Sequence, residues 1–135
     1  MKAHRIKIED KWAFVLAYDI GNEDLDEVGG WLEALGAGER EVHEAQLLLT
    51  RWNKGFTRSD TRLRMSVMCI GKATSDEQWW DTLIHEIDHL QGKILRYYDV
   101  RQDTEDAAYL QGYMMRKIIQ VLKADGYRWR HSQNI

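Results

Sequence analysis

The feature that most constrains this chain is an amphipathic pattern that extends from Ser75 to about Tyr97. Thr74 and Ser75 are each followed three residues later by Glu77 or Gln78, which is the arrangement of a capping box at a helix start. Apolar side chains then recur at the spacing of one helix face: Leu83, Ile84, Ile87, Leu90 and Ile94. We therefore predict a long helix that packs one side on a core and turns its other side to a cleft.

The polar side of this helix carries His85, Glu86 and His89 in a His-Glu-x-x-His pattern. Because the histidines are four residues apart, both imidazoles project from one face, where they can share one metal ion. Glu86 lies beside them, where a carboxylate can accept a proton from a metal-bound water. The alternative is a helix whose two histidines only hydrogen-bond locally, but the apolar frame and an acidic residue downstream favour a metal site.

A catalytic zinc ion usually takes three protein ligands and leaves a fourth position for water. Glu105 is the candidate third ligand, because it opens a helix predicted from Thr104 to Lys123 that can fold back across the motif. Asp103 and Asp106 are the fallback candidates, and an acidic residue that only complements the helix dipole is the alternative interpretation. Tyr109 follows Glu105 by one turn, so it is a candidate donor to a developing oxyanion or a packing tyrosine.

The rest of the pattern predicts a single α+β domain over residues 1–135, in which a short sheet packs on about four helices and the motif helix is central. Residues 11–20 read as a strand covered on both faces, and residues 63–70 as a strand with one exposed side. The second of these strands is expected above the motif helix, where it can pair with an extended substrate. Cys69 is assigned to the core, because it falls on the apolar phase of that strand.

Two further helices are predicted, one capped by Asn22 and one from Glu39 to Trp52, and residues 56–60 read as a loop or short edge. His43 is interpreted as a solvated histidine of the second helix. The predicted packing side of this second helix is Val42, Ala45, Leu49 and Trp52. The predicted packing side of the last helix is Ala108, Gly112, Met115, Ile119 and Leu122.

Charge and cysteine content limit the class of protein. The formal net charge of −3 gives no reason to expect a nucleic-acid binder, and no apolar run approaches the length of a membrane span. The single cysteine fits a reducing compartment, and the start of the chain has no apolar signal core. We therefore expect a cytoplasmic protein with a peptide or protein substrate, and a tail from 127 to 135 with little to bury.

The combination of His85-Glu86-x-x-His89 with Glu105-x-x-Ala108 resembles the gluzincins, which are zinc metallopeptidases with a glutamate ligand on a later helix. More closely, residues 56–57, 64–71, 82–89 and 105–113 are similar to small metallopeptidases encoded by phages and mobile elements of gut Bacteroidetes. The resemblance implies a minimal zincin-like fold, a bound zinc ion and a peptidase-like site. One departure is Asp88, a charged residue where the zincin pattern prefers an uncharged one.

The working hypothesis is hydrolysis of a peptide or amide bond, with zinc held by His85, His89 and Glu105 and with Glu86 as the general base. A second hypothesis is a zinc-binding but catalytically weak module that regulates a phage or host partner. The third is a deformylase-like amidase, because residues 85–92 look like the motif helix of peptide deformylase. In that enzyme a cysteine is the third ligand, and the surroundings of Cys69 do not match its segment.

Overall fold

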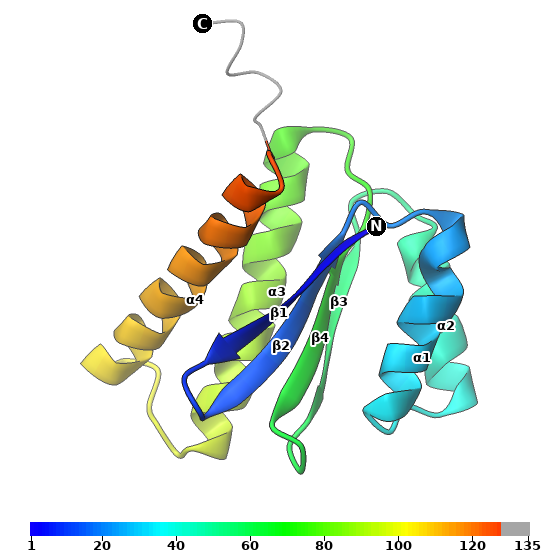
Figure 1. The fold of residues 1–135 in the computed structure, drawn as a ribbon. Helices are drawn as coiled ribbons and strands as arrows, with labels where there is room; N and C mark the ends of the chain where they lie inside the picture. Colours follow the sequence, from blue (N-terminus) through cyan, green and yellow to red (C-terminus); the bar gives the residue numbers. More distant parts are fainter. Residues whose placement is uncertain (128–135) are drawn as a thin grey trace, which may run out of the picture.

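The computed structural model describes residues 1–127, and Figure 1 shows a sheet that lies between two pairs of helices. The elements in chain order are β1 (Lys2–Ile8), β2 (Trp12–Tyr18), a 3-10 turn (Asn22–Asp24), α1 (Leu25–Ala34), α2 (Glu39–Leu49), β3 (Gly55–Asp60), β4 (Met65–Ile70), α3 (Asp76–Tyr97) and α4 (Glu105–Ala124). The predicted α+β class, with one sheet and four helices over these residues, is confirmed. Except for Tyr127, the predicted tail lies outside the described residues.

The sheet has the strand order β1-β2-β4-β3. β1 pairs with β2 and β3 pairs with β4 in antiparallel hairpins, whereas β2 and β4 run parallel at the centre. The strand β1 was not predicted, because only Ile6 and Ile8 among its residues are buried and its other side chains are mostly polar and exposed. β1 and β3 are therefore the two edges of the sheet.

The sheet has a hydrophobic core on each face. Trp12, Phe14, Leu16 and Tyr18 of β2 pack toward α3 and α4, whereas Ala17 packs toward α1 and α2. This alternation confirms the prediction that the first strand is covered on both sides. The prediction that the strand over residues 63–70 has one exposed side is wrong, because β4 lies inside the sheet and even its Ser66 is fully buried.

The helices near the motif begin and end close to their predicted bounds. Ser75 caps α3, its side chain accepting a hydrogen bond from the Gln78 amide at 3.1 Å, and Thr104 caps α4 in the same way. α2 ends at Leu49, earlier than predicted, and Trp52 is 55% exposed rather than packed. No helix within residues 1–127 combines the length and apolar character that a membrane span requires.

The packing side predicted for α4 is wrong in register. The side chains that α4 buries are Ala107, Met114, Ile118 and Leu122. Of the predicted set, Ala108 and Ile119 are exposed, and only Leu122 is fully shared with the observed face. The reason is that α4 carries apolar residues over much of its circumference, so its contact with the sheet decides which of two overlapping stripes is buried.

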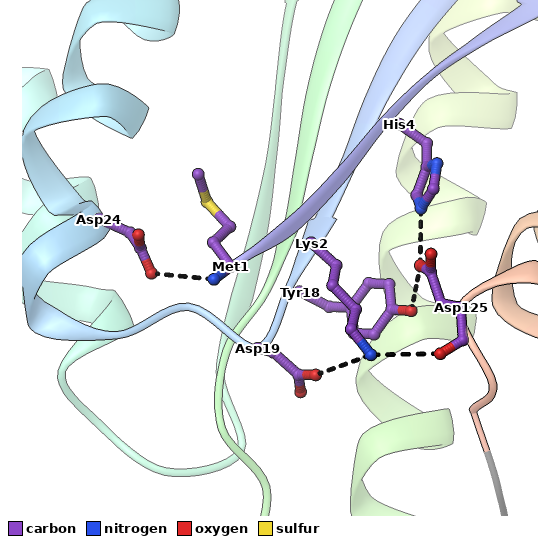
Figure 2. Close-up of polar contacts among 7 residues, drawn as sticks. All are labelled: Met1, Lys2, His4, Tyr18, Asp19, Asp24 and Asp125. Atoms are coloured by element: carbon purple, nitrogen blue, oxygen red, sulfur yellow. Dashed lines mark hydrogen bonds and ion pairs between the residues drawn. The ribbon is translucent and has the colours of Figure 1, made fainter.

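Polar contacts fasten the end of α4 to β1 and β2, as Figure 2 shows. The Asp125 carboxylate at the C-cap accepts hydrogen bonds from the Tyr18 hydroxyl at 2.5 Å and from His4 Nε2 at 2.6 Å. The bond from Tyr18, followed by the contacts with His4 and Lys2, lowers the pKa of Asp125 below its usual range. Burial, together with the Asp125 carboxylate, raises the pKa of Tyr18. These contacts hold the C-terminal end of α4 at the strands β1 and β2.

Candidate metal centre

The helix α3 places the motif residues at different depths. His85 and His89 are exposed, whereas Glu86 is only 4% exposed and lies against the sheet. This difference follows from the helical period, because Glu86 is next in sequence to His85 but turned by about 100° around the axis. The neighbouring Leu83, Ile87 and Leu90 are fully buried and hold this face of the helix in place.

The two histidines point their Nε2 atoms at each other. These atoms lie 3.1 Å apart, and the rings are nearly perpendicular, with an interplanar angle of 82°. Two nitrogen ligands at about 2.05 Å from a tetrahedral zinc ion would be about 3.3 Å apart. The pair therefore has the donor type and the spacing that two ligands of one zinc ion require.

The Glu86 carboxylate is oriented by the edge strand β3. Its Oε1 atom accepts a hydrogen bond from the Thr57 hydroxyl at 2.8 Å. The strand comes this close to α3 because of Gly55, where an added Cβ would lie 2.7 Å from the Cys69 carbonyl oxygen and 2.8 Å from Thr82 Cγ2. A buried carboxylate in a fixed orientation beside two histidines is suited to accepting and delivering a proton.

A surface pocket of about 500 Å³ is lined by the motif residues His85, Glu86 and His89 and by residues of the strand β3. Three basic side chains line it with the histidines: Arg58, Lys93 and Arg96. Arg58 is paired with Glu41 of α2, with 3.2 Å between its Nε atom and the carboxylate. Lys93 and Arg96 have no ion pair within residues 1–127. The pocket therefore joins the histidine pair to an end whose positive charge is unpaired among the described residues.

The predicted third ligand is not brought into this centre. Among residues 1–127, no three His, Cys, Asp or Glu side chains lie close enough together to hold a metal ion. Glu105 is exposed in the first turn of α4, and the fallback Asp103 forms an ion pair with Arg101 at 2.8 Å. The predicted set of His85, His89 and Glu105 is therefore not preassembled.

Asp106 and Tyr109 line a different pocket, of about 620 Å³, between α4, the end of α3 and the hairpin of β1 and β2. Tyr109 is 73% exposed and does not pack into a core. The first turn of α4 is held on another side of α3, because Gln91 Nε2 donates to the Ala107 carbonyl oxygen at 3.0 Å. Gln91 is two residues after His89 and therefore turned by about 200° around the helix axis, so this turn lies on the side of α3 away from His89.

The other singled-out residues lie as follows. Cys69 is fully buried, which confirms its assignment to the core, and burial raises the pKa of its thiol, with a smaller effect from Glu86. His43 is exposed on α2, in a pocket separate from the motif. Asp88 is exposed, and the described contacts include none between its carboxylate and either imidazole.

Sequence reasoning assigned the wrong strand to the site. The expected substrate-pairing strand, β4, is interior, and the edge that faces the motif is β3. Thr57 was therefore missed as the partner of Glu86, because a six-residue strand of mixed polarity gives little periodic signal. Lys93 and Arg96 were also missed, although they follow His89 by four and seven residues, which is the spacing of one helix face.

Comparison of the chain with protein-family models, with curated proteins and with solved structures finds no match.

Proposed function

We propose that this chain is a zinc-dependent metallopeptidase of the gluzincin type. In this proposal His85, His89 and Glu105 hold the zinc ion and Glu86 is the general base. The observation that carries it is the pair of Nε2 atoms, 3.1 Å apart, beside a buried Glu86 that Thr57 orients at 2.8 Å. A local pair of surface histidines would not need a carboxylate held in this way.

Zinc, when bound, supplies a Lewis acid that brings the pKa of a water molecule toward neutrality. Glu86 then accepts the proton of that water and delivers it to the leaving nitrogen of the amide. The Thr57 hydroxyl holds Oε1 during both transfers, which leaves Oε2 to accept the proton.

In this proposal the first turn of α4 moves around α3 toward the histidines, which breaks the hydrogen bond from Gln91 to the Ala107 carbonyl oxygen. Within the described chain Glu105 has no ion pair that would hold it elsewhere. Tyr109 follows Glu105 by one turn, and the proposal assigns its hydroxyl as a donor to the developing oxyanion.

An extended peptide is the substrate that fits beside this centre. Among residues 1–127, β3 pairs with β4 alone, so the backbone groups on its other side are available to a further strand. Phe56, Thr57, Arg58 and Ser59 of this strand all line the pocket that contains the histidines. A peptide paired with this edge would pass its backbone along α3 close to Glu86.

Metal analysis of purified variants tests the proposal. We expect about one zinc ion per wild-type chain and per Glu86→Gln chain, and a large loss of zinc from His85→Ala, His89→Ala and Glu105→Gln. His43→Ala is the matched control, because His43 is an exposed helix histidine outside the motif pocket and its loss should leave zinc binding unchanged. Wild-type protein that fails to retain zinc would refute the proposal.

Activity is tested on a peptide library with zinc-loaded protein. Glu86→Gln should lower the rate of cleavage by about 10²–10⁴-fold while zinc stays bound, which is the range of general acid–base catalysis. Thr57→Val should lower it by a smaller factor, because the carboxylate remains but loses its orientation. Full activity of the Glu86→Gln variant would contradict the assigned general base.

No third ligand is preassembled with the histidines among residues 1–127, which favours one alternative, a zinc-binding module with weak or no turnover. Zinc binding that does not depend on Glu105, together with no cleavage of any peptide, would identify that case. The deformylase alternative is less well supported, because Cys69 is fully buried and its thiol forms no metal-holding group with the histidines among the described residues. A formyl-methionyl peptide tests it directly.

A further inference from the structure

The end of the motif pocket beyond His89 carries positive charge that the proposed catalytic centre does not use. Lys93 and Arg96 follow His89 on the same face of α3, and both line the pocket. Neither has a carboxylate partner within residues 1–127, and the pocket's carboxylates are engaged elsewhere, Glu41 with Arg58 and Glu86 with Thr57. Two unpaired cations therefore remain at one end of a peptide-sized groove.

Gly92 lets one of these cations reach back toward the histidines. A Cβ atom at this buried glycine would lie 3.2 Å from Nη1 of Arg96, so the guanidinium group lies over the helix backbone at this position. Gln102 approaches the same point, with its amide nitrogen 3.8 Å from that Cβ position. The helix α3 continues through Gly92, and the glycine makes room for Arg96.

We infer that Lys93 and Arg96 form a subsite for a carboxylate of the peptide substrate, an inference that rests on the proposed function. Arginine and lysine donate charge-assisted hydrogen bonds to carboxylates, and arginine does so with a planar fork. At about 1.5 Å per residue, Lys93 lies roughly 6 Å beyond His89 along the helix. The Arg96 guanidinium group, which reaches back over Gly92, lies roughly 4.5 Å beyond His89. An extended peptide advances about 3.3 Å per residue, so the carboxylate would be about two residues from the bond next to the histidines.

The carboxylate has two sources, an acidic side chain within the peptide and the free C-terminus of the chain. Both offer the same planar, negatively charged group to the two cations. The proposal therefore predicts a preference for acidic peptides or for a scissile bond near a chain end, and the experiment separates these two cases.

The experiment measures binding of fluorescent peptides to zinc-loaded Glu86→Gln protein, which is expected to cleave them too slowly to disturb the measurement. One short neutral peptide with blocked ends is compared with versions that carry a single Glu in place of Gln on either side of the centre, and with a version that has a free C-terminal carboxylate. We expect at least one acidic version to bind about fivefold more tightly at low ionic strength, since each partly exposed pair contributes modestly. Added salt should reduce this preference.

Lys93→Gln/Arg96→Gln in the same background should remove the preference while zinc content and neutral-peptide binding stay unchanged. Arg5→Gln/Lys7→Gln is the matched control, because it removes the same charge from exposed positions of the opposite edge strand β1 and should preserve the preference. Equal binding of neutral and acidic peptides, or a preference that survives the loss of Lys93 and Arg96, would overturn the subsite. If neutral peptides bind and the acidic preference is absent, only the subsite fails. Loss of zinc from the wild-type protein is the separate result that removes the proposed function.

Discussion

Replacing Gly55 by alanine should destabilise the protein and disturb the candidate site together. The added Cβ would lie 2.7 Å from the Cys69 carbonyl oxygen, 2.8 Å from Thr82 Cγ2 and 3.5 Å from Glu86 Cγ. The first contact is with backbone of the paired strand β4, which cannot turn away as the end of a side chain could. β3 must therefore move outward from β4 and α3, and the hydrogen bond from Thr57 to Glu86 lengthens.

The expected change in the free energy of unfolding is the difference of two effects. Overpacking of this kind costs about 1–3 kcal/mol. Replacing glycine also reduces the conformational entropy of the unfolded chain, which offsets about 0.4–1 kcal/mol of this cost. We therefore expect a net destabilisation of about 1–2 kcal/mol, measured by urea unfolding followed through tryptophan fluorescence, for which the chain has six tryptophans.

Gly112→Ala is the matched control. Gly112 is exposed within α4, and a Cβ there would meet nothing within 4 Å. The same substitution at this position should stabilise the protein by about 0.5–1 kcal/mol, because alanine is the better helix former. A Gly55→Ala protein that is as stable as wild type, or that shifts in the same direction as Gly112→Ala, would refute the close approach of β3 to α3.

Three further measurements test other parts of the structure. Asp125→Asn should lower the free energy of unfolding by about 1–2 kcal/mol at neutral pH, since it weakens charge-assisted bonds from Tyr18 and His4. Because the pKa of Asp125 is lowered in the folded protein, the difference between variant and wild type in urea unfolding should shrink as the pH falls below about 3.9 and through that folded pKa. A difference that stays constant over this pH range would contradict the contact. Cys69 should resist a thiol reagent in the native protein and react once urea unfolds it, and rapid native labelling would exclude its burial. Ser75→Ala should lower stability by about 1 kcal/mol in thermal unfolding through loss of the α3 cap, and an unchanged melting temperature would argue against that cap.

Short-range sequence patterns were sufficient to predict where the helices α3 and α4, which carry the candidate site residues, begin and end. A capping box at Thr74 or Ser75 was expected to start α3, and Ser75 is its cap. The last helix was expected from about Thr104, which is the cap of α4. These features depend on residues three or four positions apart, so the sequence alone contains the interacting partners. The spacing of His85 and His89 is local in the same sense, and it gives the 3.1 Å between their Nε2 atoms.

Longer-range features were predicted poorly. β1 was missed and β4 was assigned an exposed side. The short edge that was one of two alternatives for residues 56–60 is β3, but its contact with Glu86 was not predicted. Whether a strand is interior or at an edge depends on its neighbours in the sheet, and β2 and β4 are neighbours although they are far apart in the chain. Tertiary contacts of this kind leave no periodic pattern in either segment.

The sequence by itself determined the bounds of α3 and α4, the shared face of the two histidines and the place of Cys69 in the core, because each follows from the local pattern of one helix or strand. Only the tertiary structure decided that Thr57 orients Glu86, that α4 buries Met114 and Ile118 instead of Ile119, and that Lys93 and Arg96 share a pocket with the motif. It also left Glu105 apart from the histidines, since that distance depends on how α4 docks against α3. Side chains on separate elements meet only where packing brings those elements together, and packing is a property of the whole chain.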